Sequence, residues 1–114
     1  MAEPIKLSIS GAGIVATALQ GMARQLVNIT GIADGTTALA ATVYIAGATP
    51  PTVNNSTLAA LPSDAEQVDT LECAAATTVS HNLMPNGIPL GEDGYIVVQF
   101  TDTGVNHEVF VEVQ

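Results

Sequence analysis

The chain has 114 residues and a formal net charge of −9, because eleven carboxylates oppose only two cations, Lys6 and Arg24. Binding to nucleic acid or to anionic lipid needs clustered Lys or Arg, so this charge balance excludes both function classes. Apolar residues make up 47% of the chain, which is too many for a disordered protein. The length is typical of one domain, so a single globular domain over residues 1–114 is expected.

The predicted elements are mostly strands, because short runs of β-branched or alternating residues are separated by Gly, Pro, Asn and Asp. Strands are predicted at residues 5–10, 39–46, 70–79, 94–101 and 106–113. The connections at residues 47–63 and 83–94 are rich in Pro, Gly and Asn, which predicts loops projecting from one end of a sheet structure. The expected fold class is all-β: a single antiparallel β-sandwich, immunoglobulin-like or jelly-roll-like, with at most one or two short helices.

Two segments leave room for a helix. In residues 13–28 the apolar side chains have helical spacing, but β-branched residues and Gly21 favour strand, turn and strand, which is the preferred interpretation. The sequence Ser63-Asp64-Ala65-Glu66 matches a capping box and predicts one helical turn at residues 64–68.

The last two strands are predicted to form an antiparallel hairpin around the turn Asp102-Thr103-Gly104. In the second of them the valines point to one side, while Glu108, Phe110 and Glu112 point to the other. Phe110 therefore lies on an otherwise polar face. Two interpretations stay open: both faces of this strand are buried, or Phe110 anchors a subunit interface, where aromatic residues are enriched.

The segment from Ile29 to Thr36 resembles the corner between two strands of fibronectin type III and related immunoglobulin-like sandwiches. Ala38 stands near the position where that family usually has a tyrosine. The resemblance implies a sandwich fold.

Residues for catalysis or metal binding are sparse. A grouping of Ser80, His107 and Asp102 can be drawn, but nothing in the sequence brings these residues together, and His107 is expected at the rim of a strand. The acidic residues at 64–72 and 92–102 favour a solvated rim over a weak calcium site. Cys73 is the only cysteine in the sequence, so no internal disulfide can form. It is interpreted as a buried, reduced thiol on a strand. No catalytic residue, metal or cofactor is predicted.

In overall character the chain is similar to small structural proteins of tailed bacteriophages, in particular capsid decoration (cement) proteins. The resemblance rests on an acidic, lysine-poor β domain rich in Ala, Thr, Val and Gly, without a signal peptide or a catalytic grouping. It implies a non-enzymatic protein of the virion, assembled in a host cytoplasm, that forms a homo-oligomer, with a trimer favoured, and binds the major capsid protein or another structural protein. The candidate interface residues are Lys6, Arg24, Glu108, Phe110 and Glu112.

An alternative function is an immunoglobulin-like recognition module that binds a glycan or a protein through the loops at 47–63 and 83–94. The absence of Trp and the scarcity of Tyr near these loops count against stacking on sugar rings. An enzyme is disfavoured because His, Cys and Lys are not clustered.

Overall fold

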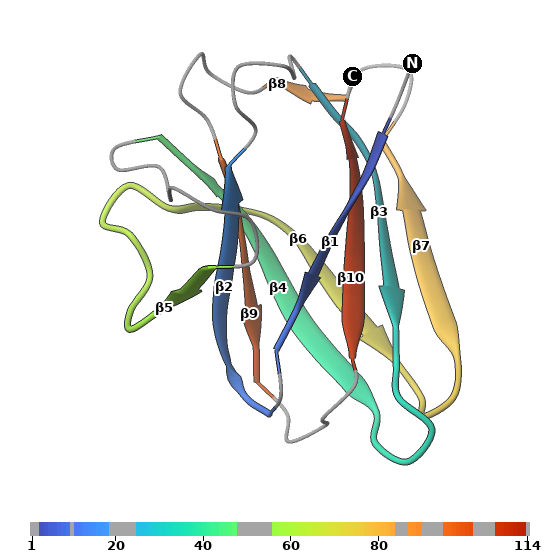
Figure 1. Ribbon diagram of the computed structural model, residues 1–114. Coiled ribbons are helices and arrows are strands. Elements are labelled where there is room, and N and C mark those ends of the chain that lie inside the picture. Colours follow the sequence, from blue (N-terminus) through green and yellow to red (C-terminus); the bar gives the residue numbers. More distant parts are fainter. Residues whose placement is uncertain are drawn as a thin grey trace.

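The computed structural model describes residues 3–9, 11–18, 25–47, 56–83, 87–89, 95–101 and 107–113. Within them every regular element is a strand, and the strands form two antiparallel sheets packed face to face (Figure 1). The strands are β1 (Glu3–Ser8), β2 (Gly13–Ala18), β3 (Gln25–Ile32), β4 (Leu39–Ala46), β5 (Ser56–Leu58), β6 (Glu66–Cys73), β7 (Thr78–Asn82), β8 (Ile88–Pro89), β9 (Tyr95–Phe100) and β10 (Glu108–Val113). The expected all-β sandwich is confirmed.

Each sheet has five strands. The first, here the β10 sheet, has the order β1-β10-β3-β7, and β8 also pairs with β3. The second, the β9 sheet, has the order β5-β2-β9-β4-β6. Consecutive strands repeatedly cross from one sheet to the other, as β1 and β2 or β6 and β7 do, so the core closes only when both halves of the chain are in place.

The core between the sheets consists of aliphatic side chains that alternate with outward-facing residues along the strands. It includes Leu7, Ile29 and Val109 from the β10 sheet and Val43 and Val98 from the β9 sheet, all of them fully buried. Each buried apolar Å² contributes about 25 cal/mol. Many small side chains therefore supply the stabilisation that a few large aromatic residues provide in other domains.

The predicted hairpin of the last two strands is wrong. β9 pairs with β2 and β4, whereas β10 pairs with β1 and β3, so the two strands lie in different sheets. The turn expected at Asp102-Thr103-Gly104 lies outside the described residues. Hydrophobic patterns identified both strands correctly, but a pattern within one strand does not specify its pairing partner.

The single strand predicted at residues 70–79 is also wrong, because the chain turns after Cys73 and enters the other sheet as β7. Cys73 is half-buried rather than buried, and its thiol donates a hydrogen bond to the Thr77 carbonyl across this turn at 3.4 Å. The turn contains Ala76 at a φ of 61°, a conformation that the alanine-rich sequence did not indicate.

The helical turn predicted at residues 64–68 does not form. Glu66 and the residues after it pair with β4 instead, and the Asp64 carboxylate accepts a hydrogen bond from the Gly47 N–H at 2.9 Å rather than capping a helix. The strand-turn-strand interpretation of residues 13–28 is confirmed for its two strands, β2 and β3, while the turn between them lies outside the described residues.

Candidate interaction surface

The outer face of the β9 sheet is covered by the chain itself. Ile14, Ala16, Tyr95, Val97 and Ala46 form a second, separate apolar cluster on this side of the sheet. Leu58, Leu61 and Ala65, from β5 and the segment that follows it, pack against the cluster. We call this side the covered face. Here the predicted loop at 47–63 is corrected in its described part: residues 56–58 form the edge strand β5, paired with β2, and Leu58 and Leu61 pack against the cluster.

The outer face of the β10 sheet is different, because no described segment packs over it. In β10, buried residues strictly alternate with partly exposed ones, which is the pattern of a strand with one face toward solvent. We call this side the open face. Its described residues are Lys6, Ser8, Asn28, Thr30, Ile32, Thr78, Ser80, Asn82, Glu108, Phe110 and Glu112.

Phe110 lies at the middle of the open face. The strand register places it in one row with Lys6 on one side and Thr30 and Ser80 on the other. Its side chain is half-buried among polar neighbours and belongs to neither apolar cluster. The interpretation that both faces of this strand are buried is therefore wrong. The exposure of Phe110 agrees with an interface anchor, which remains a proposal.

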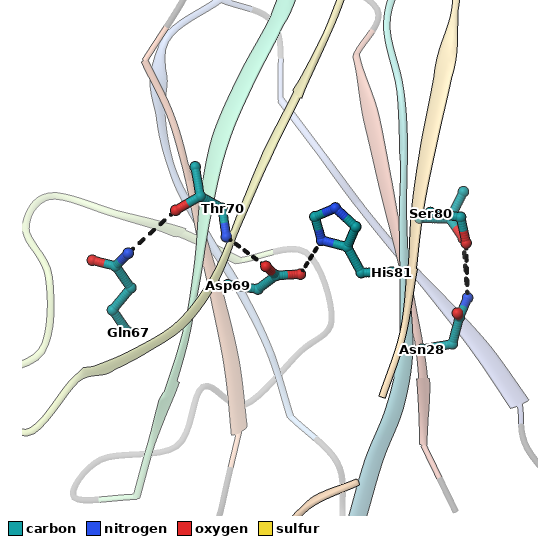
Figure 2. Close-up of polar contacts among 7 residues, drawn as sticks. Asn28, Gln67, Asp69, Thr70, Ser80 and His81 are labelled. Atoms are coloured by element: carbon teal, nitrogen blue, oxygen red, sulfur yellow. Dashed lines mark hydrogen bonds and ion pairs between the residues drawn. The ribbon is translucent and has the colours of Figure 1, made fainter. Parts of the chain in front are cut away.

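A short polar network fixes the side chains beside Phe110. The amide of Asn28 has Thr30 Oγ1 at 3.1 Å, Glu112 Oε1 at 3.4 Å and Ser80 Oγ at 3.5 Å as acceptors, and the Thr30 and Ser80 hydroxyls are 3.0 Å apart. Figure 2 shows Asn28 and Ser80 meeting across β3 and β7. Because these side chains form hydrogen bonds with one another, they hold each other in place on this face.

The charges on the open face nearly cancel. Lys6 Nζ lies 3.0 Å from Glu108 Oε2, with side chains 54% and 32% exposed, so the ion pair itself stabilises the fold by at most about 1 kcal/mol. With Glu112 the described residues of the face carry one positive and two negative charges, a sum of −1. The whole chain carries −9, so most of its negative charge comes from residues other than these three. Arg24, the other cation, lies outside the described residues.

A contact between Asp69 and His81 closes one edge of the sandwich, and the sequence did not reveal it. Asp69 Oδ2 on β6 lies 2.6 Å from His81 Nδ1 on β7, so this contact joins an edge strand of one sheet to an edge strand of the other (Figure 2). One signal was present: Asp69 alternates with Leu71 and so falls on the inward side of its strand. An inward charge on an edge strand also opposes pairing with another chain.

His107 is buried, with 1% of its surface exposed, so its expected rim position is wrong. The Asp34 N–H donates a hydrogen bond to His107 Nδ1 at 3.0 Å. The Asp34 carboxylate in turn accepts bonds from the N–H groups of Thr36 and Thr37. The aspartate therefore shapes the turn between β3 and β4, and the bond to the buried His107 ties this turn to the residue that precedes β10.

The structure does not assemble the catalytic grouping considered from the sequence. Ser80 lies on the open face, whereas His107 is buried on the other side of the same sheet, and Asp102 lies outside the described residues. Among the described residues no three His, Cys, Asp or Glu side chains converge as a metal site would require. Of the acidic residues weighed for calcium, Glu92, Asp93 and Asp102 are not described.

No protein-family model matches the chain, and neither the curated proteins nor the solved structures include a significant match. None of the described residues belongs to a helix long and apolar enough to cross a membrane.

Proposed function

We propose that the chain is a non-enzymatic structural protein of the capsid decoration type, which binds protein surfaces through its open face and reinforces a viral shell. The observation that supports this most is the difference between the outer faces. One is completed by the chain's own β5 segment, whereas the other presents a half-buried aromatic ring in a nearly neutral setting. Protein interfaces commonly combine an aromatic centre with a polar rim.

The charge distribution supports a protein partner over the other classes. A formal charge of −9 repels phosphate backbones and anionic lipid. The open face departs from this field because Lys6 offsets one of its two glutamates. Association with other copies of the chain, with the trimer expected from the resemblance, and location in the virion remain parts of this proposal.

The alternative, a recognition module that binds a glycan or a protein through its loops, has less support. In the described part of the first loop, residues 56–58 pair with β2, and Leu58 and Leu61 pack against the β9 sheet. In the second loop the described residues include Ile88 and Pro89, which pair with β3. The described parts of both loops therefore have structural roles.

Co-sedimentation tests the proposed function directly. The purified chain is mixed with empty shells assembled from the major capsid protein encoded in the same genome, and the shells are pelleted. We expect binding in a fixed ratio to shell subunits and a higher temperature of shell disruption. A chain that stays in the supernatant and leaves the disruption temperature unchanged would refute the proposal.

A further inference from the structure

We propose that the β7 edge, meaning the side of β7 that faces away from β3, takes up one further strand: an extended, cationic segment of another protein. This edge is distinct from the open face, so the inference goes beyond the proposed function and does not depend on it. Its basis is the direction of the backbone groups in β7, the composition of the edge strands, and the charges on β6.

The backbone of β7 bonds to β3 at every second residue. Beyond one end of the strand, the Leu83 N–H donates a hydrogen bond to the Val27 carbonyl at 2.9 Å. Beyond the other end, the Ala33 N–H donates to the Thr77 carbonyl at 3.0 Å. Both bonds continue the register in which β7 pairs with β3. The odd-numbered residues of β7 therefore direct their N–H and C=O groups at β3.

The even-numbered residues direct theirs the other way. The N–H and C=O groups of Thr78 and Ser80 thus point away from β3, and β7 ends the strand order of its sheet. No described residue forms a backbone hydrogen bond with these groups. The two residues are about 7 Å apart along the strand, which is the spacing at which a further strand places its own donors and acceptors.

The other edge strands carry features that oppose strand addition. β1 contains Pro4, which has no N–H, and the exposed Lys6. β5 and β8 have only three and two residues. β6 has an irregular register beside Val43 and the inward carboxylate of Asp69. In contrast, β7 pairs with β3 without a register shift, and Thr78–Asn82 contains no Pro, Lys, Asp or Glu.

The strand β6 supplies a negative field at this edge. It carries Glu66, Asp69 and Glu72 and no cation, and the contact between Asp69 and His81 joins it to β7. Glu66 and Glu72 are exposed. Packed sheets are about 10 Å apart, which is about one Debye length at 0.1 M salt. These carboxylates therefore attract cations on a strand added to β7.

The same charges disfavour a second copy of the chain as the occupant. Pairing of β7 with the β7 of another copy would bring two acidic β6 strands toward each other, and like charges repel. The β1 of another copy offers Lys6 but also Pro4, which cannot donate a hydrogen bond. A cationic segment supplies both backbone groups for Thr78 and Ser80 and positive charge for β6, as in other cases of strand addition to a sheet edge.

Hydrogen exchange with a model peptide tests the bound strand. The probe is a short peptide in which Lys alternates with Thr, acetylated and amidated at its ends. At saturation we expect exchange to slow by about tenfold or more at the Thr78 and Ser80 amides. At Val79 and His81, which already bond to β3, it should change by less than about twofold. A peptide that binds without slowing exchange at Thr78 and Ser80 would overturn the proposed edge.

Two control peptides separate backbone pairing from charge. The first has the same sequence with every backbone nitrogen methylated, which removes the donors and keeps the charges. The second has Glu in place of Lys. Both should bind about tenfold more weakly or worse, and added salt should narrow the difference between the Lys and Glu peptides. Equal binding of the methylated peptide would reduce the interaction to charge alone and overturn the strand addition.

Substitutions at Ser80 test the edge from the side of the protein. Ser80→Pro removes an N–H that does not bond to β3 and should weaken peptide binding by about tenfold or more. Ser80→Ala is the matched control: it also loses the hydroxyl 3.0 Å from Thr30 Oγ1 but keeps the N–H, so binding should change by less than about threefold. Equal binding by the two variants would overturn the inference.

Circular dichroism checks that the proline variant is folded. If Ser80→Pro does not fold, Thr78→Pro removes the other outward N–H at the first residue of the strand, where proline is tolerated, and the same loss of binding is expected.

The remaining outcomes concern other occupants. A doubled mass at about 1 mM chain without peptide, with slowed exchange at Thr78 and Ser80, would give the edge to a second copy and overturn the cationic segment. A chain that binds none of the Lys peptide at about 1 mM would overturn the inference outright. Either result leaves the proposed function in place, because that function rests on the open face and is tested with shells.

Discussion

The two sheets have similar architecture, but the outer face of one is covered and that of the other is open. The sequences of their strands β9 and β10 show the reason for this difference. β9, Tyr-Ile-Val-Val-Gln-Phe, is buried at five of its six positions, whereas β10, Glu-Val-Phe-Val-Glu-Val, is buried at every second position. A continuous apolar run requires a cover on both sides of the strand, and strict alternation requires it on one side only. The β5 segment supplies the cover for β9, and no described segment does so for β10.

The comparison indicates that the two faces contribute to different properties, one to the stability of a single chain and the other to its association. The covered face adds a second apolar cluster, so its residues should contribute to the free energy of unfolding of one chain. The open face has a polar network and one half-buried ring, so its residues should contribute little to the stability of one chain and more to its association. The following substitutions test whether this contrast holds.

The largest effect is expected from a matched pair of aromatic truncations. Tyr95→Ala removes a ring that is 1% exposed in the second cluster and should lower the free energy of unfolding by about 3–5 kcal/mol. Phe110→Ala, on the open face, should lower it by about 1 kcal/mol or less. Urea titration at low protein concentration measures both. Equal losses would show that the open face belongs to the core of the monomer.

The inner side of the β10 sheet gives the next effect. A Cβ atom added at Gly31 would lie 2.6 Å from Leu39 Cδ2 and 3.2 Å from Leu71 Cδ1, so Gly31→Ala should destabilise the fold by about 1–3 kcal/mol through overpacking. The control is Gly35→Ala in the adjacent turn, where a Cβ atom meets nothing within 4 Å. A thermal melt in which both variants behave alike would contradict this close approach of the sheets.

How much the sequence could predict differs between these elements. The alternation in β10 correctly placed Glu108, Phe110 and Glu112 on one face, and the run in β9 carried the signal of a strand covered on both sides. Neither pattern specified a partner strand, so the two were wrongly joined as a hairpin. Which strands become neighbours depends on how the whole chain passes between the two sheets, and a pattern local to one strand does not contain that information.

The candidate surface was partly predictable for the same reason. Phe110 stands out in its own strand, but the polar network of Asn28, Thr30 and Ser80 beside it comes from β3 and β7, which the sequence could not place next to β10. His107 was misplaced because its burial depends on the Asp34 turn 73 residues away. Polar contacts between segments that are distant in the sequence can be predicted only once the pairing and register of the strands are known.

A third test addresses the edge at which the two sheets meet. The contact between Asp69 and His81 joins them with side chains that are 18% and 39% exposed, so solvent screens it in part. A double-mutant cycle with Asp69→Ala and His81→Ala should give a coupling free energy of about 1 kcal/mol near neutral pH. Coupling near zero would mean that packing alone holds this edge closed, and that Asp69 serves only to oppose strand addition.

The smallest expected effect is a stabilisation at the turn that carries the chain from the β9 sheet to the β10 sheet. Ala76 is exposed and has a φ of 61°, a conformation that costs a residue with a Cβ atom about 1 kcal/mol and costs glycine almost nothing. Glycine also loses more conformational freedom on folding, so Ala76→Gly should raise the free energy of unfolding by only about 0.5 kcal/mol.

The control is Ala74→Gly, exposed in the same turn without a positive φ, which should lower stability by a similar amount. The Ala76 N–H donates a hydrogen bond to the Asp34 carbonyl at 2.7 Å, so the backbone is held in place in both variants. Two glycine variants with the same sign in chemical denaturation would contradict the left-handed turn, and with it the tight crossing that separates β6 and β7 into different sheets.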